Sequence, residues 1–149
     1  MLPPMTTTRR TFLKVVGAGA VCTGLPLGCP ATGIVDAGNV SDLTEGEVAQ
    51  IDKAQVLVGR DAGGIYAMTA LCTHFGCDLS GPDGTIDPDG TVHCGCHGSA
   101  YHADGTVLNG PAVNPLQHLE VTIAADGAIT VDLSKGVGID VRAPVPAAG

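Results

Sequence analysis

Short apolar stretches separated by turn residues recur through the chain from about residue 34 onward. Three pairs of such stretches flank a turn: 55–59 with 65–70, 85–87 with 91–93, and 119–123 with 128–133. The intervening turns read Asp61-Ala62-Gly63-Gly64, Pro88-Asp89-Gly90 and Asp126-Gly127. Glycine, proline and aspartate at these places are typical of hairpin connections. The pattern therefore predicts antiparallel strands throughout this part of the chain, and no helix within it.

The composition supports a small all-β domain. The chain has 149 residues, with 22 Gly, 10 Pro and only 3% aromatic residues. This favours short strands joined by many turns, so we expect a small antiparallel sandwich or barrel. A domain of this size buries a modest core and usually needs a covalent or metal cross-link, which six cysteines could supply. We predict a leader at 1–31, one folded domain at 32–135 and a Pro/Ala-rich tail at 136–149.

The first 31 residues resemble an export signal. Residues 8–14 read Thr-Arg-Arg-Thr-Phe-Leu-Lys, and a weakly apolar run follows from Val15 to Leu27. A basic start, a short apolar segment and a small-residue exit are typical of such signals. The paired Arg9 and Arg10 resemble the twin-arginine export consensus. The apolar run is too short to cross a bilayer core of about 30 Å as a helix.

Two endings of the leader are open. Leu25 to Cys29 resembles a bacterial lipoprotein box, in which Cys29 would be lipidated and would anchor the protein to a membrane. Pro26 and Pro30 depart from that pattern. The other reading is cleavage after Ala31, with small residues at the positions that a signal peptidase requires.

Charge is distributed unevenly along the chain. The formal net charge is −8, and the residues from 29 onward hold four basic and fifteen acidic side chains. Such a surface repels phosphate backbones, which argues against a nucleic-acid partner. It suits a positively charged redox partner, and it suits solubility equally well.

Two short stretches carry metal-ligating residue types. The first reads Cys72-Thr73-His74-Phe75-Gly76-Cys77, and the second Cys94-Gly95-Cys96-His97-Gly98-Ser99-Ala100-Tyr101. Each follows a predicted strand and offers one cysteine and one histidine at close spacing. Thiolates and imidazoles are the ligands that iron or zinc accepts in proteins.

These loops resemble the Rieske iron–sulfur family, and specifically its high-potential branch. The resemblance spans roughly residues 40 to 133, and it departs from the family pattern at Phe75, where leucine is usual, and at Gly95, where proline is usual. It implies one [2Fe–2S] cluster in a Rieske-type β fold with a cluster-binding subdomain. The implied ligands are Cys72, His74, Cys94 and His97, since two histidines replace two cysteines on one iron of a Rieske centre.

The resemblance also implies roles for residues around the cluster. Ser99 is expected to donate to a bridging sulfide, and Tyr101 to the sulfur of Cys72. Gly110 and Pro111 are similar to the family's proline loop, which covers the cluster from a third side. The remaining pair, Cys77 and Cys96, lies one in each loop and is expected to form a disulfide outside the cytoplasm.

Other interpretations of these residues remain to be separated. A zinc site of two cysteines and two histidines could use the same side chains. Three structural disulfides among six cysteines would leave His74 and His97 without a role. His93, His102 and His118 are interpreted as surface or strand residues without a ligand role. The sequence contains no evident constellation for substrate catalysis, so we expect an electron-transfer protein or the redox subunit of an oxidoreductase rather than an enzyme by itself.

The function that follows is one-electron transfer outside the cytoplasm, after export by the twin-arginine route. The chain would be a periplasmic or membrane-tethered carrier, or the small redox subunit of an oxidoreductase. Its partner would be a cytochrome or a larger oxidoreductase subunit. The alternative is the Rieske subunit of a cytochrome bc-type quinol oxidoreductase.

Overall fold

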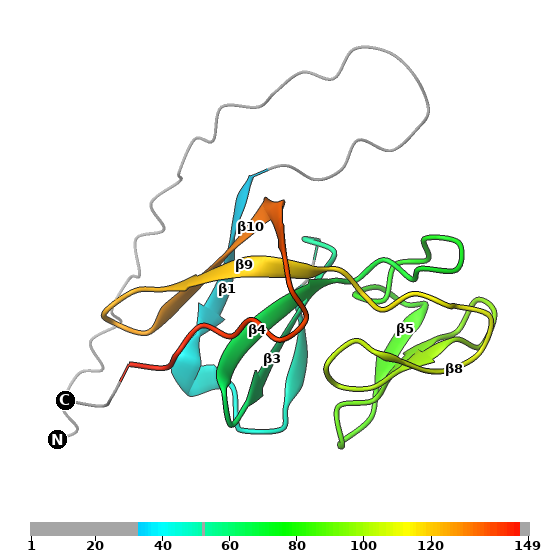
Figure 1. The fold of residues 1–149 in the computed structure, drawn as a ribbon, viewed down its shortest axis with the longest axis horizontal. Helices are drawn as coiled ribbons and strands as arrows, with labels where there is room; N and C mark the ends of the chain where they lie inside the picture. The colour runs from blue at the N-terminus through cyan, green and yellow to red at the C-terminus, as the bar shows by residue number, and fades with distance from the viewer. Residues whose placement is uncertain (1–32, 52, 147–149) are drawn as a thin grey trace, which may run out of the picture.

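The computed structural model describes residues 33–51 and 53–146, which form two antiparallel β-sheets (Figure 1). The predicted leader, including Arg9, Arg10 and Cys29, lies outside the described residues. Within them, no helix is long and apolar enough to cross a membrane. The all-β prediction is confirmed, with one correction. A single 3-10 turn, Val40–Asp42, follows the first strand because Asn39 caps it: the Asn39 side chain accepts from the Ser41 N–H, and the Asp42 carboxylate accepts from the Asn39 N–H.

Six strands make the larger sheet, in the order β1-β10-β9-β4-β3-β2. Their bounds are β1 Ile34–Asn39, β2 Val48–Ile51, β3 Val56–Asp61, β4 Gly64–Thr69, β9 His118–Ile123 and β10 Ala128–Val137. The smaller sheet has the order β5-β6-β7-β8, with β5 Gly84–Ile86, β6 Val92–Cys94, β7 Ala100–Tyr101 and β8 Val107–Asn109. The smaller sheet lies between β4 and β9 in sequence, although β4 and β9 pair with each other through Ala67 and Leu119.

The continuous apolar runs of β3 and β4 arise because both faces of these strands are buried. Val56 and Val58 on β3 join one core, together with Ile65 and Ala67 on β4. The intervening side chains, such as Leu57, join a second core under the smaller sheet. Successive side chains of a strand point to opposite faces, so a strand between two cores is apolar at every position. This places the smaller sheet firmly against the larger one.

Two buried aromatic side chains hold the turn between β7 and β8. His118 on β9 is 2% exposed, and its Nε2–H donates to the carbonyl of Asp104 at 2.8 Å. Its ring stacks on Tyr66 of β4 at 5.6 Å, and the Tyr66 hydroxyl donates to the carbonyl of Ala103 at 2.8 Å. His118 and Tyr66 of the larger sheet therefore fix the position of the β7–β8 turn through hydrogen bonds to its backbone carbonyls.

His118 should make the stability of the protein depend on pH. Burial lowers the pKa of His118 below its ordinary value; the bond to Asp104 opposes this, and the charge of Arg142 adds to it. The unfolded chain therefore takes up a proton at a higher pH than the folded chain. The free energy of unfolding should then decrease as pH falls below about 6.5, with a slope of up to about 1.4 kcal/mol per pH unit from this group.

Urea unfolding between about pH 7.5 and about pH 5.5 checks this prediction. His118→Gln keeps an N–H donor for the Asp104 carbonyl but cannot titrate, so its stability should fall less steeply over the same range. Equal slopes for the two proteins would contradict the prediction.

Candidate metal centre

The two cysteine loops have the same backbone design. In the first, the Gly76 N–H donates to the Cys72 carbonyl at 2.7 Å and the Cys72 N–H to the Cys77 carbonyl at 2.9 Å. In the second, the Gly98 N–H donates to the Cys94 carbonyl at 3.1 Å and the Cys94 N–H to the Ser99 carbonyl at 2.8 Å. The fifth residue of each turn is a glycine with positive φ, +75° at Gly76 and +79° at Gly98, a conformation that other residues adopt at a cost. Each turn thus starts at its cysteine with the same backbone bonds, and its histidine follows two residues later in the first turn and three residues later in the second.

Cys72 and Cys94 are buried free thiols. Burial alone raises the pKa of Cys72, but hydrogen bonds from the Tyr101 hydroxyl and the His74 N–H outweigh it and lower the pKa below its usual value. Burial raises the pKa of Cys94, and the neighbouring Cys72 adds to that effect. The two thiols therefore lie close enough to influence each other, with donors already directed at Cys72.

His74 and His97 lie beside each other, and both are less buried than the two thiols. Their ring centroids are 5.0 Å apart at an interplanar angle of 82°. The Nδ1 atom of His74 is buried and has no hydrogen-bond partner. A buried polar atom without a partner is costly, and a metal ion would satisfy it. Two thiols and two imidazoles, one of which carries this unpartnered nitrogen, fit a mixed sulfur and nitrogen metal centre.

The Tyr101 hydroxyl connects the first cysteine loop to a third loop, residues 110–117 between β8 and β9. It lies 3.3 Å from the Cys72 Sγ, and it accepts from the Thr73 N–H at 3.0 Å. Thr73 Oγ1 lies 3.0 Å from the same hydroxyl and donates to the Asn114 carbonyl at 2.6 Å. Since the single Thr73 hydroxyl proton is used on Asn114, Tyr101 is the donor toward Cys72 or Thr73 Oγ1. No sequence motif indicates the role of Thr73, which depends on a residue 41 positions away.

The third loop packs against the second through Ser99. The Ala112 N–H donates to the Ser99 Oγ at 3.2 Å, which leaves the hydroxyl proton of Ser99 free to donate elsewhere. Ser99 is buried, whereas Gly110 and Pro111 are exposed. Gly110 has a φ of +100°, and a Cβ there would lie 2.5 Å from the Ser99 Cα. The loop therefore approaches the second cysteine loop as closely as a glycine permits.

Cys77 and Cys96 form a disulfide that joins the two loops, as the resemblance implied, with their Cα atoms 6.7 Å apart. The Sγ of Cys94 belongs to the same group: it and the two disulfide sulfurs lie within 4.8 Å of one another. Two of these sulfurs are already bonded to each other, so the group is not a three-thiolate metal site.

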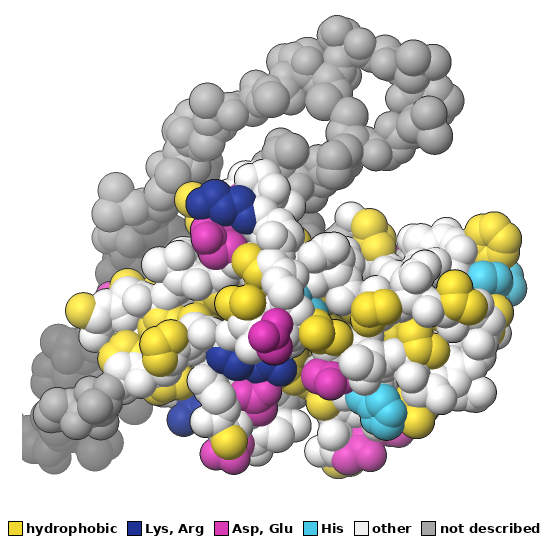
Figure 2. Space-filling model, in the orientation of Figure 1, with side chains coloured by type: hydrophobic (Ala, Val, Ile, Leu, Met, Phe, Trp, Pro, Cys, Tyr) yellow, Lys and Arg dark blue, Asp and Glu magenta, His cyan; other side chains and the backbone are white. Residues whose placement is uncertain are grey.

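Three large apolar side chains are exposed on the first cysteine loop, on β8 and on the loop after it, and the first of them contacts a histidine. Phe75 is 76% exposed and contacts His74 edge-on, with ring centroids 4.2 Å apart. Val113, 82% exposed, and Leu108 are also large apolar residues open to solvent. Figure 2 shows a histidine beside a hydrophobic side chain at the end that carries the smaller sheet, while the lysines and arginines visible in this view lie over the larger sheet. We call Phe75, Leu108 and Val113 the apolar rim.

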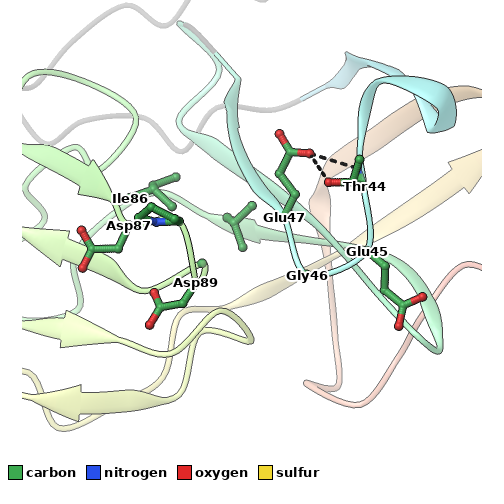
Figure 3. Close-up of a pocket in the computed structure, with 10 residues that line it drawn as sticks. Thr44, Glu45, Gly46, Glu47, Ile86, Asp87 and Asp89 are labelled. Carbon is green, nitrogen blue, oxygen red and sulfur yellow. Dashed lines mark hydrogen bonds between the residues drawn. The ribbon is translucent and has the colours of Figure 1, made fainter.

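A separate cleft of about 600 Å³ lies between the β1–β2 connection and the β5–β6 turn (Figure 3). Its lining includes four carboxylates, from Glu45, Glu47, Asp87 and Asp89. Glu47 is used locally, since its Oε2 accepts from the Thr44 N–H and hydroxyl at 2.9 Å, and Asp87 lies 2.9 Å from the His93 Nε2. Glu45 and Glu47 point away from each other. The carboxylates do not converge, so the cleft does not form a cation site.

Comparison with known proteins agrees with this geometry. A family model described as "Rieske [2Fe-2S] domain" matches residues 33–120. The cytochrome b6-f complex iron-sulfur subunit of Chlorobaculum tepidum is 35% identical over 99 residues, which is 65% of this chain and 52% of that protein. A second such subunit, from Chlorobaculum thiosulfatiphilum, is 31% identical over 94 residues, 62% of this chain and 50% of that protein. The chain thus spans about half the length of these curated relatives.

Two solved structures share the fold. The plasma membrane Rieske protein PetC3 of the cyanobacterium Synechocystis PCC 6803 is 31% identical, with a TM-score of 0.51 over 66% of this chain and 98% of that one. A chain in the complex of oxygenase and ferredoxin of carbazole 1,9a-dioxygenase is 26% identical, with a TM-score of 0.52 over 70% of this chain and 97% of that one. The domain described by the family model binds a [2Fe–2S] cluster. From its two cysteine loops, its two sheets and the match over residues 33–120, the chain belongs to the Rieske [2Fe–2S] family.

Proposed function

We propose that this chain transfers single electrons through one high-potential [2Fe–2S] cluster held by Cys72, His74, Cys94 and His97. The observation that carries the proposal is the pairing of two buried free thiols with a buried, unpartnered His74 Nδ1 on loops tied by a disulfide. When bound, the cluster supplies one-electron redox chemistry. The protein supplies ligands, burial and hydrogen bonds, and His97 offers an exposed side chain toward a partner.

The ligand set and its donors favour a high potential. Two thiolates and two neutral imidazoles carry two fewer negative charges than four thiolates, so adding an electron costs less electrostatic work. Ser99 has a free hydroxyl proton, and Tyr101 can donate to the Cys72 sulfur. Hydrogen bonds to sulfur become more favourable as negative charge accumulates there, so both side chains stabilise the reduced state. We place the potential in the upper half of the family range of about −150 to +300 mV.

Replacement of Tyr101 by Phe should lower the reduction potential, because it removes one hydrogen bond to Cys72. If that bond stabilises the reduced state by about 1 kcal/mol more than the oxidised state, the potential falls by about 40 mV. Protein-film voltammetry measures the difference. Tyr66→Phe is the matched control, because the Tyr66 hydroxyl donates to the Ala103 carbonyl and has no part in the site. Equal potentials in wild type and Tyr101→Phe would show that Tyr101 only packs.

The apolar rim supports docking of a redox partner over the histidines. The Phe75 ring centroid lies 5.7 Å from that of the exposed His97, and Val113 exposes further apolar surface on the loop that packs against Ser99, an arrangement typical of interaction sites. The chain's acidic surface favours a partner that is positively charged around an apolar contact. We assign the partner to the class of cytochromes or larger oxidoreductase subunits.

A second candidate function is the iron–sulfur subunit of a cytochrome bc-type quinol oxidoreductase. The relatives support it, since two of them are iron-sulfur subunits of cytochrome b6-f complexes. Co-purification decides between the two: a cytochrome b recovered with this chain from native membranes supports the subunit, and a free carrier would be recovered alone. Both functions use the same cluster and ligands.

We further propose an extracytoplasmic location, reached by twin-arginine export directed by the leader at 1–31. The Rieske relatives, one of them a plasma membrane protein, support a membrane-associated site. Changing Arg9 and Arg10 to Lys should leave folded, cluster-containing protein in the cytoplasm, which cell fractionation would detect. Cys29→Ala should separately release exported protein from the membrane if Cys29 is lipidated. Normal export of the double-lysine variant would rule out the twin-arginine route.

A further inference from the structure

Cys94 lies beside a disulfide that it does not belong to. Its Sγ and the two sulfurs of the Cys77–Cys96 bond lie within 4.8 Å of one another. Cys94 is a buried free thiol, and it is one of the two cysteines assigned to the cluster. The other, Cys72, is not part of this group of three sulfurs. Of the two ligand cysteines, Cys94 is therefore the one whose sulfur lies within this distance of both disulfide sulfurs.

We propose that Cys94 exchanges with the disulfide when the chain has lost its cluster. Thiol–disulfide exchange needs a free thiolate near a disulfide sulfur and proceeds by its attack on that sulfur. The Cys94 thiol gives its proton to water, and the resulting thiolate attacks the Sγ of Cys77. A Cys77–Cys94 bond forms, the Cys77–Cys96 bond breaks, and the Cys96 sulfur leaves as a thiolate that takes up a proton from water. The number of disulfides is unchanged, so the step requires no oxidant or reductant.

Attack on Cys77 is favoured over attack on Cys96. A Cys77–Cys94 bond still joins the two cysteine loops and closes a chain segment of nearly the same length as the original bond, whose sequence separation is 19. The loop-closure entropy is then almost unchanged. A Cys94–Cys96 bond would instead connect residues two apart and release the first loop from the second. The freed thiol is then that of Cys96, which is half-buried, whereas Cys94 is buried.

As a consequence, the exchange would prevent the cluster-free protein from binding a new cluster. A Cys94 engaged in a disulfide cannot serve as a ligand, so the exchanged chain has lost one of the four ligands proposed above. In cluster-loaded protein the same sulfur is bound to iron and is withheld from the disulfide. The cluster must therefore be inserted before the Cys77–Cys96 bond forms. Loss of the cluster in an oxidising compartment should be irreversible without a reductant. This inference rests on the proposed function, because it takes Cys94 as a ligand.

Disulfide mapping of the full chain tests the inference. Cluster-loaded, oxidised protein is divided in two, and one half is stripped of iron anaerobically with a chelator near neutral pH. Both halves are quenched in acid, their thiols are alkylated with N-ethylmaleimide, and the proteins are digested with pepsin. Fragment spectra then separate Cys94 from Cys96. The loaded half should show a Cys77–Cys96 bond with Cys72 and Cys94 alkylated, and the stripped half a Cys77–Cys94 bond with Cys72 and Cys96 alkylated.

Reconstitution supplies a second readout. The stripped half should fail to take up iron and sulfide until a thiol reductant is added, and then recover. A stripped half that keeps the Cys77–Cys96 bond with Cys94 free would overturn the inference, and so would entry of Cys72 into disulfides at the same rate, which would indicate random scrambling. A Cys77–Cys94 bond in the loaded half as well would instead refute Cys94 as a ligand, and with it the proposed site.

Discussion

Cys94→Ala protein should contain almost no iron or acid-labile sulfide, whereas the wild type should contain about two of each per chain. Cys94 is a buried thiol at the end of β6, and alanine there has no atom that can bind a metal. A metal centre that loses one of two thiolate ligands loses its closed coordination and exposes iron to water. Iron and sulfide analysis, with electron paramagnetic resonance of the reduced protein, measures the effect.

His102→Ala is the matched control for this loss. His102 is exposed on the β7–β8 turn, so the variant removes one imidazole without touching the two cysteine loops. It should retain the wild-type iron content and spectrum. Full iron and sulfide in Cys94→Ala would refute the ligand set, and zinc without labile sulfide in wild-type protein grown with iron would support the zinc alternative.

Gly110→Ala should destabilise the cluster-binding half by about 3 kcal/mol. Two costs add: strain at a φ of +100°, and a new Cβ placed 2.5 Å from the Ser99 Cα and 2.6 Å from the Gly98 carbonyl oxygen. Both contacts are backbone atoms, which cannot rotate away. The third loop must then move off the second, and the bond from the Ala112 N–H to Ser99 is lost with it.

Gly46→Ala separates the strain from the contact. Gly46 has a similar φ of +90°, but a Cβ there meets nothing within 4 Å, so this variant should lose only about 1 kcal/mol. Chemical denaturation of both variants gives the difference. In addition, Gly110→Ala should lose iron faster than wild type on dilution into a chelator. Equal stabilities for the two variants would mean that the third loop is not closely packed on Ser99.

The hairpins could be predicted from the sequence because their information is local. The β3–β4 pair has continuous apolar strands and a glycine-rich turn, and β5–β6 and β9–β10 are marked by Pro88-Asp89-Gly90 and Asp126-Gly127. Strands β7 and β8 could not be predicted, because segments of two and three residues are too short to show an alternation of apolar and polar positions. The 3-10 turn after Asn39 depends on side-chain capping of a very short segment, which an apolar pattern does not reveal.

The candidate site could likewise be predicted only where its information is local in the sequence. The Cys–His spacing and the Cys77–Cys96 pairing could be anticipated from two short motifs, and the structure confirms the disulfide. The ligand assignment itself stays a prediction. The contact of Thr73 with Asn114 and the burial of His118 depend on packing between segments distant in sequence, so no motif indicates them.

The pairing of β4 with β9 gives the molecule two units of local unfolding. Residues 70–117, which include both cysteine loops and the smaller sheet, leave the larger sheet after β4 and return to it at β9. The strands on either side of this segment, β4 and β9, pair with each other, so residues 70–117 can open while the larger sheet keeps its backbone hydrogen bonds. Cooperative segments of this kind open at a lower free energy than the whole domain does. The hydrogen-exchange protection of residues 70–117 should therefore depend on the metal centre, the disulfide and the core that this segment shares with the larger sheet, whereas the larger sheet also has the core on its other face.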